Sequence, residues 1–213
     1  MHCASLAMTQ NYFQFEDVLY HQIRGTSMGS TFAPSLACLY MYQFEKNFIL
    51  PVTNPFFNNI KLWRCYIDDI LIIWQGALPN IDLFTSWINT LDPFLKFTAH
   101  ISTTQVPFLD LLIHNVNGKL ETDTYHKITD RNSLRRYDSY HPKALRDNLP
   151  FGQFLRLRRN CSSVHLFEAQ ACELKEKLQH RCCPTKIINS SYKRARNNHR
   201  EALLESTMRE EQT

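Results

Sequence analysis

The chain has 213 residues, of which 44% are apolar and 12% are aromatic. This composition excludes a disordered chain, and the length allows one large domain or two small ones. The net charge of +4 is unevenly distributed, because residues 1–118 hold 5 Lys and Arg against 8 Asp and Glu, whereas residues 119–200 hold 18 against 8. The basic second half predicts a polyanionic partner, although a solvated helical surface would have the same composition.

No apolar run reaches the roughly 20 residues that cross a bilayer, so we expect no contact with a membrane. Residues 1–6 lack the charged start and apolar core of a secretion signal. The seven cysteines have no scaffold-like spacing, which favours reduced thiols in an intracellular protein, nuclear or cytoplasmic and not secreted. Cys182 and Cys183 follow His180 but lack the second Cys/His pair of a zinc finger, so zinc is only weakly indicated.

The start of the chain predicts two helices separated by a short hairpin. Residues 1–11 read as the end of a helix, and residues 13–15 and 18–23 as short strands. A helix follows at 32–47, where apolar residues recur at helical spacing and Pro34 occupies the first turn, in which no N–H donor is needed.

Later elements alternate until about Asp130 and are mainly helical beyond it. Asn117-Gly118 predicts a tight turn between two strands. Strands are predicted at 97–102, 108–115 and 119–127, and helices at 80–91, 155–159, 164–179 and 187–204. The sequence therefore predicts an α+β fold, with a small antiparallel sheet and packed helices followed by a mainly helical basic region.

Two adjacent carboxylates, Asp68 and Asp69, interrupt an otherwise apolar run of β-forming residues. A buried charged pair within a strand would be strongly penalised by desolvation, so we expect a hairpin with strands at 65–67 and 70–74 and both carboxylates at its tip. Binding of Mg²⁺ would relieve the repulsion between the two carboxylates. This arrangement is typical of two-metal phosphoryl transfer.

A glycine-containing loop precedes the helix at 32–47. Gly25 and Gly29 allow the backbone to pass close to a ligand, and the start of a helix favours phosphate nearby. Alone, this segment would be an ordinary helix-entry loop. Followed by the Asp-Asp hairpin, it becomes a specific signal of function.

Together these motifs resemble the reverse transcriptase family. Gly25-Thr26-Ser27-Met28-Gly29 with Ala33-Pro34 is similar to motif B, and Tyr66-Ile67-Asp68-Asp69 is similar to motif C. Further segments are similar to Penelope-like retroelement polymerases: Phe108-Leu109-Asp110-Leu111, the segment 127–132, Ser139-Tyr140-His141-Pro142, Leu149-Pro150, Gly152-Gln153, and Arg156, Arg158, Arg159, Cys161 and Ser162. The resemblance covers about residues 11–186, with Ile128 where the family usually has proline.

The resemblance implies an RNA-directed DNA polymerase that uses two Mg²⁺ ions, an RNA template, a DNA primer or RNA–DNA hybrid, and a dNTP; it implies no obligate protein partner. Asp68 would coordinate the catalytic ions, and Asp69 would take part more weakly or indirectly. The nucleotide and template pocket would be lined by Tyr66, Gln22, Gly25, Met28 and Gly29, with Tyr66 against the primer end.

The resemblance also places the later part of a right-hand polymerase palm at residues 1–128 and a basic helical thumb at 129–213. Such a thumb would grip nucleic acid through phosphate contacts, which carry affinity but little sequence information. The candidates are Arg135, Arg136, Arg156, Arg158, Arg159, Lys193, Arg194 and Arg196. The cluster at 193–196 could equally be a solvated helix face or a weak nuclear signal.

One essential family element is not found. Reverse transcriptases carry a further metal-binding Asp in motif A, before motif B, and nothing in residues 1–19 fits it. Asp17 reads as a surface residue in a turn, and Asp110 as a strand-end residue with backbone hydrogen bonds. We therefore expect an incomplete fragment whose isolated chain is inactive. The alternative is a catalytically dead nucleic-acid-binding remnant or a co-opted module.

Overall fold

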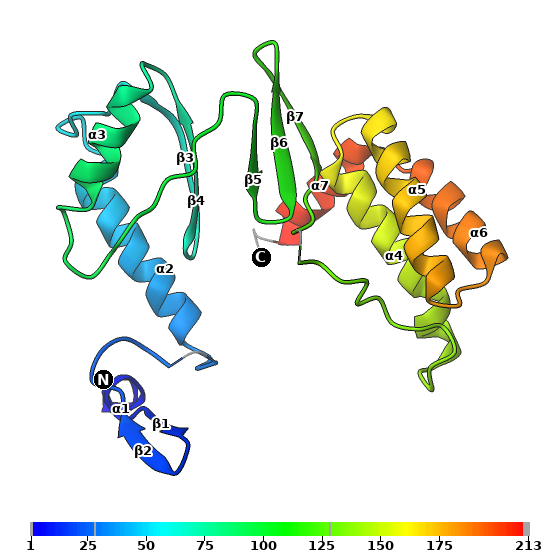
Figure 1. Cartoon of the computed structure of the whole chain (residues 1–213), viewed down its shortest axis with the longest axis horizontal. Coiled ribbons are helices and arrows are strands. Elements are labelled where there is room, and N and C mark those ends of the chain that lie inside the picture. Colours follow the sequence, from blue (N-terminus) through cyan, green and yellow to red (C-terminus); the bar gives the residue numbers. More distant parts are fainter. Residues whose placement is uncertain (1, 28, 128, 211–213) are drawn as a thin grey trace. The chain divides into compact units, whose positions relative to one another are not determined.

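The computed structural model describes residues 2–27, 29–127 and 129–210. It is a mixed α+β structure with small antiparallel sheets, as the sequence predicts at this coarse level (Figure 1). The chain divides into two compact units, Met1–Ala99 and His100–Thr213. The polymerase-based boundary at 128–129 falls inside the second unit, because the three-stranded sheet of that unit packs with the helices that follow it.

The first unit contains a separate β-hairpin and a larger hairpin packed against helices. Its elements are α1 (His2–Thr9), β1 (Tyr12–Phe15), β2 (Val18–His21), α2 (Ala33–Phe44), the π-helical turn η1 (Glu45–Ile49), β3 (Ile60–Tyr66), β4 (Asp69–Trp74) and α3 (Pro79–Ile88). The core forms where α2, η1 and α3 meet one face of the β3–β4 hairpin, with Phe44, Ile49 and Ile88 buried.

The second unit joins a three-stranded sheet to a helical bundle. Its elements are β5 (Gln105–Phe108), β6 (Leu111–Val116), β7 (Lys119–Thr124), α4 (Lys143–Asn160), α5 (Val164–His180), α6 (Thr185–Arg196) and α7 (Arg200–Glu210). Phe154 and Phe167 are fully buried between the helices. Reciprocal hydrogen bonds between Thr122 of β7 and Ser162, in the α4–α5 connection, fasten the sheet to the bundle.

Several predicted elements are wrong in their extent. The predicted strand 97–102 is irregular, because the backbone of Phe97 bonds to the Asn89 side chain rather than to another strand. The predicted strand 108–115 contains a turn at Leu109-Asp110 between β5 and β6. The Asn117-Gly118 turn is confirmed, with both residues at positive φ.

The helical predictions differ mainly in length. The predicted helix 155–159 is part of α4, which continues through Pro150; that proline is fully buried, so tertiary packing offsets the lost backbone hydrogen bond. The predicted helix 187–204 is divided into α6 and α7 at residues 197–199. No helix among the described residues is both long and apolar enough to span a membrane.

Candidate active-site hairpin and nucleic-acid interface

The β3–β4 hairpin confirms the strands around the Asp-Asp motif but moves the turn by one residue. Tyr66 pairs with Asp69, so Ile67 and Asp68 form the turn and Asp69 is the first residue of β4. The prediction that both carboxylates occupy the tip is therefore wrong for Asp69. Ile67 is held at a φ of +55°, a left-handed conformation that is unusual for a β-branched residue.

Alternation along the two strands separates the apolar face of the hairpin from its polar face. Cys65 and Ile70 are paired and pack against the core, whereas Tyr66 and Asp69 lie together on the opposite face and are exposed. Asp68 is also exposed. The carboxylates thus project from a strand pair whose other face is anchored in the core.

Glu45 in η1 anchors β3, the first strand of this hairpin. The indole N–H of Trp63 in β3 donates a hydrogen bond of 2.8 Å to the Glu45 carboxylate. Burial, followed by the charge of Glu45, raises the pKa of the Cys65 thiol to about 11. The protonated thiol of Cys65 is therefore favoured at neutral pH, and the thiol is a weaker nucleophile than the thiolate.

The Asp pair fits part of a magnesium site. No Lys, Arg or His forms an ion pair with Asp68 or Asp69 among the residues described, so their oxygens are open to a cation. One or two carboxylates together with substrate phosphates are enough to hold Mg²⁺. A group of three His, Cys, Asp or Glu side chains that could hold a metal is not found in the described parts of the chain.

The backbone of the glycine loop is left-handed at both of its glycines. Gly25 and Gly29 have φ values of +77° and +91°, in the region that favours glycine. The Gln22 side chain donates to the Arg24 carbonyl at 2.7 Å and lies beside Gly25, where a Cβ atom would approach its amide nitrogen to 3.3 Å. Met28 lies outside the described residues.

The predicted pocket is not assembled in this structure. Between the described residues of the glycine loop and Tyr66, Asp68 or Asp69, no hydrogen bond, ion pair or ring contact is formed. Gln22 and Gly25 are close together, and so are Tyr66 and Asp69, but these are two separate pairs.

Five of the predicted phosphate-binding residues are engaged within the second unit. Three form ion pairs, Arg136 with Asp138 at 2.7 Å, Arg196 with Glu168 at 2.9 Å, and Arg156 with Asp110. Two others pack on aromatic rings, Arg158 over Phe167 and Arg194 over Phe151. Arg158 also donates to the Asn198 carbonyl, which joins α4 to the connection between α6 and α7.

The other three predicted phosphate-binding residues are Arg135, Arg159 and Lys193. Their side chains are exposed and form no hydrogen bond or ion pair with the described residues. They therefore carry the positive charge that is most readily available to a phosphate.

A polar groove of about 630 Å³ was not predicted from the sequence. It lies between the β5–β6 turn, the segment after β7, α4 and α5. Asp110 borders it and pairs with Arg156, and its carbonyl accepts from the Tyr125 N–H at 2.8 Å. Asp110 is thus a turn residue with a side-chain partner, not only a strand-end residue. Segments at 108–111, 127–132 and 149–159, which carry the family resemblance, all contribute to this groove. Their resemblance to one family was the sequence signal that could have pointed to it.

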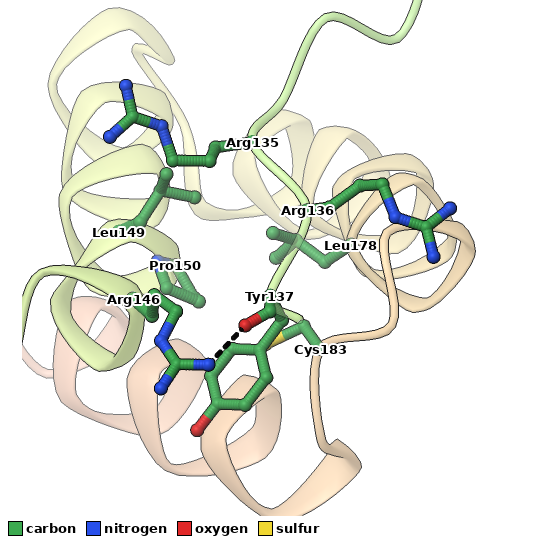
Figure 2. Close-up of a pocket in the computed structure, with 8 residues that line it drawn as sticks. All are labelled: Arg135, Arg136, Tyr137, Arg146, Leu149, Pro150, Leu178 and Cys183. Carbon is green, nitrogen blue, oxygen red and sulfur yellow. Dashed lines mark hydrogen bonds between the residues drawn. The ribbon is translucent and has the colours of Figure 1, made fainter. Parts of the chain in front are cut away.

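Figure 2 shows a much smaller pocket around Tyr137, next to Arg135 and Arg136. Arg146 reaches over the Tyr137 ring and donates to its carbonyl at 2.7 Å. The volume is about 10 Å³, room for a single water molecule at most. This pocket is a packing feature that holds the segment before α4.

Comparison with protein families finds a match in the second unit. The family model of the animal helix-turn-helix domain matches residues 133–193, which include α4, α5 and most of α6. No curated protein and no solved structure matches the chain. In helix-turn-helix proteins one helix enters the major groove of DNA. The matched region contains six of the eight predicted basic residues, since Arg194 and Arg196 lie beyond it.

Proposed function

We propose that the chain belongs to an RNA-directed DNA polymerase of a retroelement, a Mg²⁺-dependent enzyme that transfers nucleotides to a primer 3′-hydroxyl. The observation that carries this proposal is the pair of exposed carboxylates, Asp68 and Asp69, at the end of a hairpin anchored in an apolar core. Its substrates would be an RNA template, a DNA primer or RNA–DNA hybrid, and a dNTP.

The physical support comes from what nucleotidyl transfer requires of a protein. This chemistry depends on positioning and on neutralising charge, with little covalent work for side chains. A strand pair braced by the Trp63–Glu45 hydrogen bond is a stiff support for two carboxylates. Neither carboxylate has a competing cationic side chain among the described residues.

A second candidate is a nucleic-acid-binding module without catalysis. It is favoured by the helix-turn-helix match and by the finding that the described residues bring only two carboxylates to the hairpin end. Both candidates assign the phosphate contacts to the second unit. The polymerase adds a metal site at Asp68 and a nucleotide and template pocket in the first unit.

Primer extension separates the candidates. The purified chain is given Mg²⁺, an RNA template annealed to a DNA primer, and dNTPs, beside an Asp68→Asn control. Extension that disappears in the control supports the polymerase. Without extension, binding of the primed template that Mg²⁺ strengthens in the wild-type chain but not in Asp68→Asn supports an incomplete polymerase. Salt-sensitive binding that neither Mg²⁺ nor Asp68→Asn changes favours the binding module. If the chain neither extends nor binds, both candidates are wrong.

A further inference from the structure

The polar groove of the second unit has an excess of unpaired positive charge. Two charged contacts lie at its border, Arg156 with Asp110, and His126 with Asp130 at 3.2 Å. Four other charged groove residues form no ion pair with the described residues: the cations Lys127, Arg131 and Lys177 and the carboxylate Glu173. The groove therefore favours an anionic ligand.

The polar side chains of the groove are ordered along α5. Gln170, Glu173 and Lys177 all line the groove and follow one another at helical spacing. The Asn132 amide donates to the Lys177 carbonyl at 2.9 Å, which brings the neighbouring Arg131 to that end of the groove. Gln170 and Lys177 are about 10 Å apart along the helix axis. Positive charge thus lies at one end and an amide at the other, with Glu173 between them.

Apolar surface and unpaired polar groups complete the lining. Leu157 and Leu174 are buried and Tyr125 is half-buried, so a planar ring can pack against them. The side chain of Gln153 forms no hydrogen bond with the described residues. The hydroxyl of Thr124 is buried and also lacks a partner among them. Such a group calls for a ligand or a water molecule, which a turn about its one side-chain bond would let it meet.

We propose that this groove binds a free ribonucleoside triphosphate. The phosphates contact the three unpaired cations, and Glu173 accepts hydrogen bonds from the ribose hydroxyls, as acidic residues do in dinucleotide sites. The base packs on Tyr125 and bonds to the Gln153 amide. The volume of about 630 Å³ is in the range of small-molecule sites.

This site lies in the second unit and goes beyond the proposed function, which places a dNTP with Mg²⁺ in the first unit. The groove holds phosphates with side-chain cations, so binding there needs no metal ion. Nucleotide binding in the groove is therefore independent of primer extension, and each can fail without the other.

Isothermal titration calorimetry of the full chain with ATP in EDTA tests the site. ATP should bind saturably, and Lys177→Ala and Lys127→Ala should each weaken the affinity about tenfold, because each removes a charge-assisted hydrogen bond. The matched control is Lys186→Ala. Lys186 is exposed on α6 and forms no ion pair with the described residues, so this change should alter the affinity by less than about twofold. Asp68→Asn should also leave ATP binding in EDTA unchanged.

Two related ligands test the parts of the nucleotide. Adenosine, which lacks phosphates, should bind far more weakly than ATP. dATP lacks the 2′-hydroxyl and should bind several-fold more weakly, because Glu173 then has one donor fewer. Equal affinities for ATP and dATP would overturn the choice of a ribonucleotide.

Phosphates could also come from a nucleic-acid strand, so a short single-stranded RNA is titrated in parallel. Binding of the RNA without binding of ATP would assign the groove to a strand and overturn the proposal. Equal losses in Lys177→Ala and Lys186→Ala, or loss of ATP binding in Asp68→Asn, would overturn it too. Thermal melts followed by circular dichroism check that each variant folds, and Lys127, which is exposed, provides the second test if Lys177→Ala does not.

Discussion

At the residue scale, the turns of three hairpins share one backbone form. Glu16, Ile67 and Leu109 each have a φ between +53° and +55°, and each is followed by an Asp. Asp is a common turn residue because its side chain bonds to the nearby backbone. The place of Asp68 in a turn is therefore not in itself a sign of catalysis; what distinguishes this turn is the second carboxylate, Asp69, that follows it.

Another left-handed residue ends α5. Cys182 has a φ of +62°, its N–H donates to the Gln179 carbonyl, and the N–H of Cys183 donates to the Leu178 carbonyl. This is a Schellman motif, in which the left-handed position is usually glycine. The motif sets the direction in which the chain enters α6.

We expect Cys182→Gly to raise the free energy of unfolding by about 0.5–1 kcal/mol, because it removes the steric cost of a side chain at positive φ. Urea unfolding measures the change. The matched control is Cys172→Gly, at an exposed position within α5, which should lower the free energy by about the same amount. A loss of stability in both variants would contradict this account of the turn.

At the element scale, one tyrosine fastens the irregular segment before α4. The Tyr137 hydroxyl donates to Asp147 at 2.7 Å, and the Tyr137 N–H donates to the Arg181 carbonyl at 2.8 Å. Lys143 also donates to Asp147, at 2.6 Å. The segment is thereby held to α4 and to the end of α5, where the helix-turn-helix match lies.

These bonds predict a pH dependence at both extremes. The hydrogen bonds from Lys143 and then Tyr137 lower the pKa of Asp147 below its usual 3.8. Because the folded state favours the charged carboxylate, this contribution is present above about pH 4 and is lost as the pH falls through the lowered pKa. The bond to Asp147 raises the pKa of Tyr137 above 10.0, so that contribution is present below about pH 10 and is lost as the pH rises.

Thermal melts between pH 2 and pH 6 test the acid limb. The melting temperature of the wild-type chain should fall more steeply with acid than that of Asp147→Asn, in which the titrating group is absent. Parallel curves for the two chains would show that Asp147 is not linked to folding.

At the scale of the whole molecule, the chain has two separate cores. One is built on Phe44, Ile49 and Ile88, and the other on Phe154 and Phe167. The candidate carboxylates belong to the first unit, and the predicted phosphate-binding residues belong to the second. The candidate metal-binding carboxylates and the candidate phosphate-binding residues therefore lie in different folded units.

We expect residues His100–Thr213, produced alone, to fold with one cooperative thermal transition, since this unit has its own core. The fragment should also keep the salt dependence of nucleic-acid binding shown by the full chain. A gradual, non-cooperative melt would show that the second unit depends on the first.

The sequence by itself determined the features that depend on neighbouring residues. The apolar, β-forming run that Asp68 and Asp69 interrupt predicted the β3–β4 hairpin, and Asn117-Gly118 predicted the turn before β7. The mixed α+β content also follows from these local patterns.

Only the tertiary structure decided which basic side chains are free to contact a partner and where the strands begin. The turn at Ile67-Asp68 and the division between β5 and β6 depend on strand pairing, which a local pattern leaves open by a residue or more. The sequence offered eight basic residues as candidates for phosphate contacts, but Arg156 meets Asp110 and Arg196 meets Glu168 only after folding. Contacts between residues far apart in the chain thus leave Lys186 and Lys193 open to a partner while engaging Arg156 and Arg196 within the fold.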